Sequence, residues 1–153
     1  MSIYFSTGGY KNQISKDVVK TLIDIGIKDI ELSGTCYSEN NIKDLEKFLE
    51  FSNLQIHNYF PPPKEPFVLN LASMDEVIAK KTFDHIMSAI DVCTELNCKY
   101  YSFHAGFLCD IKINELGKKV DRKMLQDREK SIDLFVNRVS KISEKAKQKN
   151  INI

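Results

Sequence analysis

Short apolar and β-branched stretches alternate with longer amphipathic stretches along the whole chain, and this alternation restricts the fold more than any other feature. Strands that alternate with helices form a parallel sheet, so we expect an α/β protein. Two folds share this order: a flavodoxin-like open sheet and part of a (β/α)8 barrel. The expected strands lie at residues 3–6, 27–33, 54–58, 99–104 and 151–153.

The length of the chain and its last residues favour different folds. A complete barrel needs about 250 residues, so a chain of 153 residues favours the open sheet. An open-sheet domain, however, normally ends with a helix that covers its last strand. This sequence ends within the strand pattern 151–153.

Capping residues give the expected ends of the helices. Ser15 is expected to cap the first helix and Gly26 to end it. Ser73-Met74-Asp75-Glu76 has the pattern of a capping box and opens the longest helix, which Asn97 can end in a left-handed conformation. Asn150 can end the last helix. The apolar positions of the three long helices are Val18, Val19, Leu22, Ile23 and Ile25; Val77, Ile78, Ile86, Ile90, Cys93 and Leu96; and Ile132, Phe135, Val136, Val139, Ile142 and Ala146.

Composition excludes several classes of protein. The net charge of +1 makes nucleic acid an improbable partner, because a nucleic-acid-binding domain carries a strongly basic face. No signal-peptide pattern is present, and no apolar run approaches the ~20 residues that cross a bilayer, so we expect a cytoplasmic protein without a membrane partner. Four cysteines occur without a C-x-x-C motif and are expected to be reduced thiols.

Two histidines end strand patterns and are the first candidates for chemistry. His57 closes the pattern 54–58, and His104 closes the pattern 99–104 just before Ala105 and Gly106. In parallel α/β folds, ligands bind at the carboxyl ends of the strands, so both rings are expected to face one cavity. They could bind a metal ion or a substrate oxygen; the alternative is a packed structural histidine. His85 lies within a helix pattern and is expected to be structural.

Glu31 is the third candidate. Its strand neighbours Ile30 and Leu32 point to the opposite face, toward the covering helices. An unpaired carboxylate would be costly in an open sheet with both faces covered, whereas in a barrel it would point into the mouth. The alternative is a solvated or ion-paired glutamate. Thr7-Gly8-Gly9 lacks the residues of a phosphate loop and is expected to be a turn.

Several segments together resemble the xylose-isomerase-like TIM-barrel superfamily, which includes sugar-phosphate isomerases and epimerases and the apurinic endonuclease IV type. They lie in the order and spacing of that superfamily and span nearly the whole chain. The segments are Gly26-Ile27-Lys28-Asp29-Ile30-Glu31-Leu32, Ile56-His57-Asn58, Leu69-Asn70-Leu71-Ala72-Ser73 and Tyr100-Tyr101-Ser102-Phe103-His104-Ala105-Gly106.

The resemblance implies a fold and a chemistry. Residues 1–153 would be a partial domain, namely strands one to four of a (β/α)8 TIM barrel with their helices and the start of strand five. In the superfamily a divalent metal ion (Mn, Mg or Zn) serves the reaction, and His57 and His104 match positions that hold metal in the endonuclease branch. The acid/base carboxylates of the isomerase branch would lie beyond Ile153.

The function expected from this resemblance is that of a metal-dependent sugar or sugar-phosphate isomerase or epimerase. The substrate contacts would be Glu31, His57 and His104, with metal at the two histidines. The alternatives are an endonuclease-IV-like phosphodiesterase acting on DNA and a non-enzymatic flavodoxin-like binding domain. Loop 107–120 is a candidate active-site loop. The gene is expected to continue past Ile153, and the chain alone is expected to be inactive and to associate into a homo-oligomer.

Overall fold

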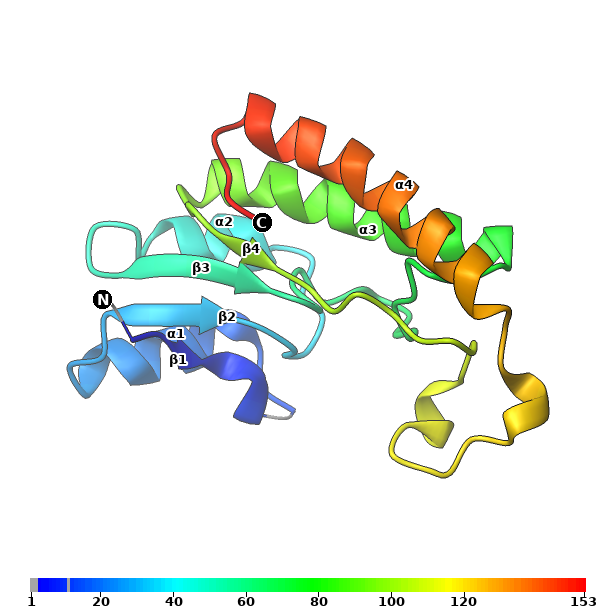
Figure 1. The fold of residues 1–153 in the computed structure, drawn as a ribbon. Coiled ribbons are helices and arrows are strands. Elements are labelled where there is room, and N and C mark those ends of the chain that lie inside the picture. The colour runs from blue at the N-terminus through cyan, green and yellow to red at the C-terminus, as the bar shows by residue number, and fades with distance from the viewer. Residues whose placement is uncertain (1–2, 11) are drawn as a thin grey trace. The chain divides into compact units, whose positions relative to one another are not determined.

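The computed structural model describes residues 3–10 and 12–153, and its helices and strands alternate as expected (Figure 1). The chain divides into two compact units. The first comprises Met1–Lys64, Ala89–Phe103 and Ala146–Ile153, and the second comprises Glu65–Ser88 and His104–Lys145.

The elements are β1 (Phe5–Ser6), α1 (Ser15–Asp24), β2 (Asp29–Leu32), α2 (Asn41–Glu46), β3 (Asn53–His57), α3 (Glu76–Glu95), β4 (Tyr101–Ser102) and α4 (Arg128–Gln148), with short 3-10 helices at Thr7–Gly9, Ile113–Glu115 and Arg122–Met124.

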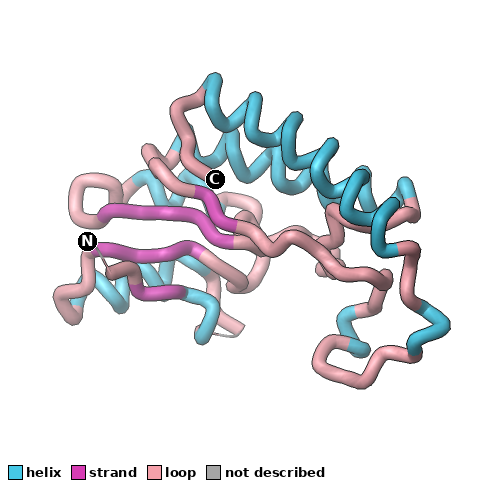
Figure 2. The backbone as a smooth tube through the Cα atoms, viewed as in Figure 1, coloured by secondary structure: helices cyan, strands magenta, loops and turns pink. Residues whose placement is uncertain are grey.

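The first unit contains a parallel sheet with strands in the order β1-β2-β3-β4 (Figure 2). In the register of this sheet, Ile30 pairs with Phe5 on one side and with Leu54 on the other, and Ile56 pairs with Tyr101. Asn152 forms a further parallel bridge with Tyr100, where the expected strand 151–153 begins. The α/β class and the parallel order are therefore confirmed.

One face of this sheet forms the core of the first unit. The strands contribute alternate residues, because successive side chains of a strand point to opposite faces. Figure 1 shows α1 and α2 behind the strands, and the last turns of α3 belong to the same unit. The buried core residues are Ile30, Leu32, Leu54, Ile56 and Tyr101 from the strands, Val18, Val19 and Leu22 from α1, Leu45 from α2, and Ala89, Ile90 and Cys93 from α3.

Residues with positive φ lie beyond the ends of three helices, as the sequence predicts. Gly26 follows α1 with φ of 88°, Asn97 follows α3 with φ of 54°, and Asn150 follows α4 with φ of 56°. Glycine and asparagine are the residues that tolerate this left-handed conformation best. The predicted ends of these three helices are therefore confirmed.

The starts of α1 and α3 differ from the prediction. Ser15 is the first helical residue of α1 and not its cap, and its hydroxyl pairs with that of Thr35. Asp75 rather than Ser73 caps α3: its Oδ1 accepts from the backbone N–H groups of Val77 at 2.8 Å and Ile78 at 3.3 Å. Ser73 instead accepts from the N–H of Asp75 at 3.0 Å, so its hydroxyl supports the turn that precedes the helix.

Four of the expected core positions are exposed. Ile25 lies beyond the last residue of α1, and Val77 lies in the first turn of α3, where the helix has not yet been covered. Ile132 and Val136 lie one turn apart in α4 and are exposed, whereas Ile142 and Ala146 further along the helix are buried. Helical spacing identifies an apolar stripe, but it does not say where along the stripe another element packs.

The four cysteines are free, and Cys93 and Cys98 are buried. Within residues 3–10 and 12–153, no helix is long and apolar enough to cross a bilayer.

Candidate functional site

The second face of the sheet in the first unit is polar. In β2 and β3 the buried residues alternate with half-buried or exposed polar ones, as predicted for Glu31 opposite Ile30 and Leu32. The register places Glu31 between Ser6 of β1 and Gln55 of β3, and His57 beside Ser102 of β4. We call this surface the polar face; it comprises Ser6, Asp29, Glu31, Asn53, Gln55, His57 and Ser102.

Hydrogen bonds between neighbouring strands orient the side chains of the polar face. The amide of Asn53 donates to Asp29 Oδ1 at 2.7 Å, and the amide of Gln55 reaches Glu31 Oε2 at 3.5 Å. An amide donor beside the Glu31 carboxylate leaves further acceptor sites on its two oxygens, because an ionised carboxylate accepts about four hydrogen bonds. Glu31 can therefore accept hydrogen bonds from the hydroxyl groups of a ligand.

His57 is the last residue of β3, and Ser102 fixes its ring. His57 Nδ1 and Ser102 Oγ are 2.9 Å apart. When Nδ1–H donates to the hydroxyl, the lone pair of the neutral ring is on Nε2, which is the arrangement found in metal-binding and acid/base histidines. The position of His57 at the carboxyl end of a parallel strand agrees with the prediction.

Hydrogen bonds connect the loops that follow β1, β2 and β3 at this end of the sheet. Thr7 Oγ1 accepts from the N–H of Ser33 at 2.8 Å and is itself fully buried. Ser33 Oγ donates to the carbonyl of Asn58 at 3.3 Å. The Thr7–Gly9 segment is a single 3-10 turn, in which the Gly8 N–H donates to Ser6 Oγ. The expectation of a turn there is confirmed.

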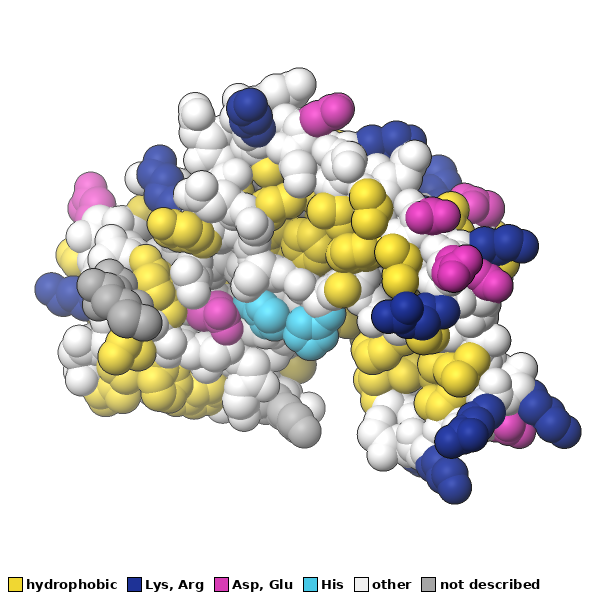
Figure 3. Space-filling view, in the orientation of Figure 1, with side chains coloured by type: hydrophobic (Ala, Val, Ile, Leu, Met, Phe, Trp, Pro, Cys, Tyr) yellow, Lys and Arg dark blue, Asp and Glu magenta, His cyan; other side chains and the backbone are white. Residues whose placement is uncertain are grey.

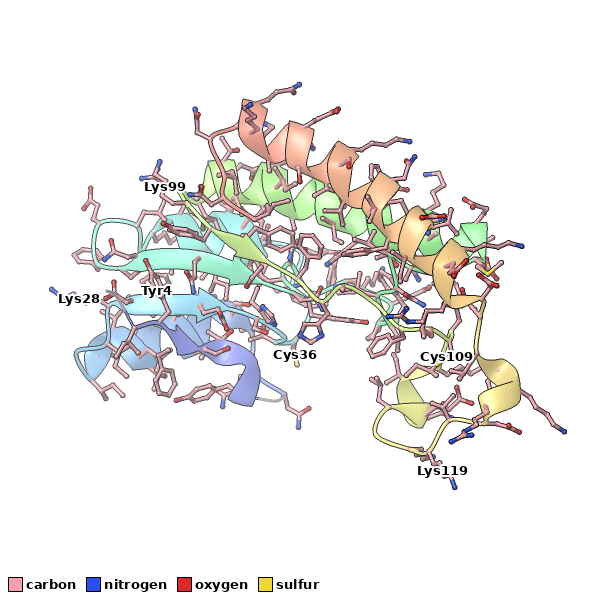
Figure 4. The ribbon with its side chains drawn as sticks, in the orientation of Figure 1. Tyr4, Lys28, Cys36, Lys99, Cys109 and Lys119 are labelled. Atoms are coloured by element: carbon pink, nitrogen blue, oxygen red, sulfur yellow. The ribbon has the colours of Figure 1, made fainter. Side chains whose placement is uncertain are left out.

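Tyr4 lies over the sheet just before β1 (Figure 4). Burial raises the pKa of its hydroxyl, and the negative charge of Asp29 raises the pKa further. The phenol therefore stays protonated at neutral pH and can donate a hydrogen bond.

His104 lies outside the sheet, which corrects one boundary. The strand pattern 99–104 was expected to reach it, but β4 ends at Ser102 because pairing with β3 stops at His57. His104 is exposed and belongs to the second unit, whereas Glu31 and His57 belong to the first. The single cavity expected for both imidazole rings remains a prediction.

No ready-made metal centre exists among the described residues, since they contain no group of three or more His, Cys, Asp or Glu side chains placed to hold a metal ion. His57 and His104 could supply two ligands, while a structural zinc site has four and a catalytic one has three from protein. The residues described here do not form a complete site for the divalent ion.

A buried polar cluster in the second unit was not predicted. Asn70, which is 1% exposed, accepts through Oδ1 from the N–H of Phe107 at 2.9 Å and donates through Nδ2 to Asp110 Oδ1 at 2.7 Å. Asp110 Oδ2 accepts from Ser73 Oγ at 2.7 Å and from the amide of Gln126 at 2.8 Å. A lone asparagine between Leu69 and Leu71 was the available signal, because a buried polar side chain needs partners.

This cluster holds the beginning of loop 107–120, whose one regular element is the short 3-10 helix Ile113–Glu115, in agreement with the predicted irregular loop. Cys109 and Lys119 mark the two ends of that region in Figure 4. Burial raises the pKa of the Cys109 thiol, and the nearby carboxylate of Asp110 raises it further, so this cysteine is a poor nucleophile.

His85 on α3 is structural, as expected. Its ring meets that of Phe67 edge-on with the centroids 5.9 Å apart. Burial lowers the pKa of His85 to about 4, so the ring is neutral at pH 7.

The fold and the sequence agree with a single family. The model of the xylose isomerase-like TIM barrel family matches residues 19–153. The chain belongs to this family. Membership confirms the expected resemblance and supports the barrel over the flavodoxin-like alternative.

Individual relatives of this xylose isomerase-like chain are distant. A segment of 54 residues is 35% identical to "Probable endonuclease 4" from Persephonella marina and covers 35% of this chain and 19% of that protein. An L-ribulose 3-epimerase structure matches with a TM-score of 0.68 and 15% identity over 97% of this chain and 47% of its own length. The TTHB071 protein from Thermus thermophilus, soaked with ZnCl2, matches with a TM-score of 0.64 and 17% identity over 99% and 54% of the two chains. The chain thus spans about half the length of the solved structures it matches, and at these identities the likeness establishes the fold.

Proposed function

We propose that this chain contributes the sugar-binding strand ends of a sugar or sugar-phosphate isomerase or epimerase. The observation that carries the proposal is the polar face, where Glu31 and His57 are held by Gln55 and Ser102 beside the carboxyl ends of parallel strands. In TIM-barrel enzymes this end of the strands carries the active site. Structural likeness to a protein named L-ribulose 3-epimerase supports the same substrate class.

The chemistry of the polar face suits a polyhydroxy ketone. The carboxylate of Glu31 accepts hydrogen bonds from sugar hydroxyls, and the imidazole of His57 donates to or accepts from a sugar oxygen. Proton transfer beside the carbonyl needs a further acid/base pair, and we propose that residues other than Glu31 and His57 supply it. A divalent ion would polarise the carbonyl, with His57 as one of its ligands and the others from outside the polar face.

Binding of ketoses provides the test. L-Ribulose and D-tagatose are titrated into the protein by calorimetry with Mn²⁺ present, and sorbitol serves as the polyol without a carbonyl. We expect the ketoses to bind and Glu31→Gln to weaken binding about fivefold, the effect of losing roughly 1 kcal/mol of hydrogen bonding. Glu50→Gln removes an exposed carboxylate outside the polar face and should leave affinity unchanged.

A second candidate function is that of a metal-dependent phosphodiesterase acting on DNA, which the 54-residue similarity to "Probable endonuclease 4" favours. The formal net charge of +1 speaks against a large phosphate-binding surface. A duplex with one abasic site separates the two proposals. Salt-dependent binding of that duplex, with no heat from either ketose, would replace the epimerase proposal by the endonuclease one.

A further inference from the structure

The second unit contains an apolar pocket of about 570 Å³ between the start of α3 and the loop after β4. That volume lies in the range of small-molecule sites, roughly 300–1,000 Å³. None of its residues belongs to the polar face. The pocket is lined by Pro66, Phe67, Val68, Asn70, Val77, Ile78, Lys81, Asp110, Ile111, Lys112, Ile113 and Asn114.

Apolar residues make up seven of the twelve that line the pocket, five of them branched aliphatic, and two of these are open to solvent. Val77 is 77% exposed and Ile113 is 48% exposed, although both occupy ordered elements. Figure 3 shows hydrophobic side chains next to lysine and arginine side chains on the surface of the second unit. Covering aliphatic surface is favourable by about 25 cal/mol per Å², so an apolar chain would gain free energy in this pocket.

Hydrogen bonds fix the polar part of the pocket wall in advance. Asn70 and Asp110 both line the pocket and bond to each other at 2.7 Å. The second carboxylate oxygen of Asp110 accepts from Ser73 and Gln126. The Asp110 carboxylate is therefore engaged by three donors, and the pocket wall needs little rearrangement to accept a ligand.

Two ammonium groups give the pocket its charge preference. The Lys81 Nζ lies 4.3 Å from the centroid of the Phe67 ring, at the pocket wall. Lys112 stands between Ile111 and Ile113 in the loop. No ion pair joins either ammonium group to a carboxylate among the described residues, in contrast to Lys80, which pairs with Asp84. Against these two cations the pocket has one carboxylate, that of Asp110, so its charge is net positive.

We propose that this pocket binds a medium-chain aliphatic carboxylate, with the chain against Val77, Ile78 and Ile113 and the carboxylate at Lys81 and Lys112. The apolar part of the wall selects the chain, because five branched aliphatic residues, a proline and a phenylalanine line it. The two ammonium groups select the anion over the neutral compound of the same length. This site is separate from the proposed sugar-binding function and does not depend on it.

Calorimetry with octanoate as the probe tests the proposal, and 1-octanol is the uncharged compound of equal chain length. We expect octanoate to bind more tightly than 1-octanol. Lys81→Met and Lys112→Met keep the apolar stem and should each weaken octanoate about fivefold, as expected for losing roughly 1 kcal/mol from a partly exposed ion pair. Neither change should alter the binding of 1-octanol.

Lys80→Met is the matched control, because Lys80 precedes Lys81 on α3 but does not line the pocket. It should leave octanoate affinity unchanged, and thermal melting confirms that every variant is folded. Absence of octanoate binding to the wild-type protein would overturn the proposal. Equal affinity of octanoate for the wild type and the Lys81→Met/Lys112→Met double variant would overturn it too, as would an equal loss in Lys80→Met.

Discussion

Gly106 shows how a single residue fixes the path of the chain after β4. Its φ is 130°, and a Cβ atom built there would overlap Asn70 Oδ1 and lie 3.1 Å from the backbone nitrogen of Ala72. Both the backbone conformation and the contact with a buried side chain require glycine. Ala105 and Gly106 stand out in the sequence as small residues after His104, but the contact of Gly106 with Asn70 is visible only in the structure.

Gly106→Ala is expected to lower the free energy of unfolding by about 2–4 kcal/mol, because it adds strain at positive φ and displaces the Asn70 side chain. Urea denaturation measures this change. Gly9→Ala is the matched control: apart from the adjoining residues, no atom of the described part of the chain lies within 4 Å of its added Cβ, and the effect should stay within about 0.5 kcal/mol. Equal effects of the two changes would contradict the role of Gly106.

His85 predicts a pH dependence of stability. Its pKa is about 4 in the folded protein, against an ordinary value of 6.5, because burial disfavours the charged ring. The unfolded chain therefore binds more protons between these values, so stability falls as the pH drops from about 6.5 to 4. The loss should approach roughly 2–3 kcal/mol at pH 4. Urea denaturation of wild type and His85→Gln across this range measures it, and a parallel loss in the variant would assign the effect to other groups.

At the scale of elements, the start of α3 depends on a carboxylate and not on the serine that the capping-box pattern indicated. Asp75 accepts from two backbone N–H groups of the first turn, while the hydroxyl of Ser73 donates a hydrogen bond to Asp110. A local pattern cannot reveal that a distant loop competes for the hydroxyl of its first residue. Helix starts are for this reason harder to predict than the glycine and asparagine ends.

Replacing the cap of α3 tests this assignment. Asp75→Ala should destabilise the protein by about 1 kcal/mol, the usual effect of losing an N-cap. Glu76→Ala is the control: this exposed residue pairs with Arg138 at 3.2 Å, and the change should have an effect below about 0.5 kcal/mol. Thermal melting separates the two. A larger effect for Glu76→Ala would show that the ion pair, and not the cap, fixes the start of α3.

At the scale of the whole molecule, the polar face predicts self-association. Parallel sheets are normally covered on both faces, yet Ser6 and Ser102 on the polar face are exposed. We expect sedimentation velocity at increasing concentration to show dimers or larger species. Ser102→Arg should shift the equilibrium toward the monomer, whereas the same change at Asp133, an exposed residue of α4, should not (Asp133→Arg). A monomer at every concentration would contradict this expectation.

The sequence alone determined the order of strands and helices, the parallel sheet, the face of β2 that carries Glu31 and the position of His57 at a strand end. These features depend on periodicity and on residues with special backbone conformations, which are local properties. Only the tertiary structure decided the pairing of His57 with Ser102, the burial of Asn70 against Asp110 and the pocket beside Lys81. Those contacts join residues far apart in the chain, and their geometry depends on packing that no local pattern encodes.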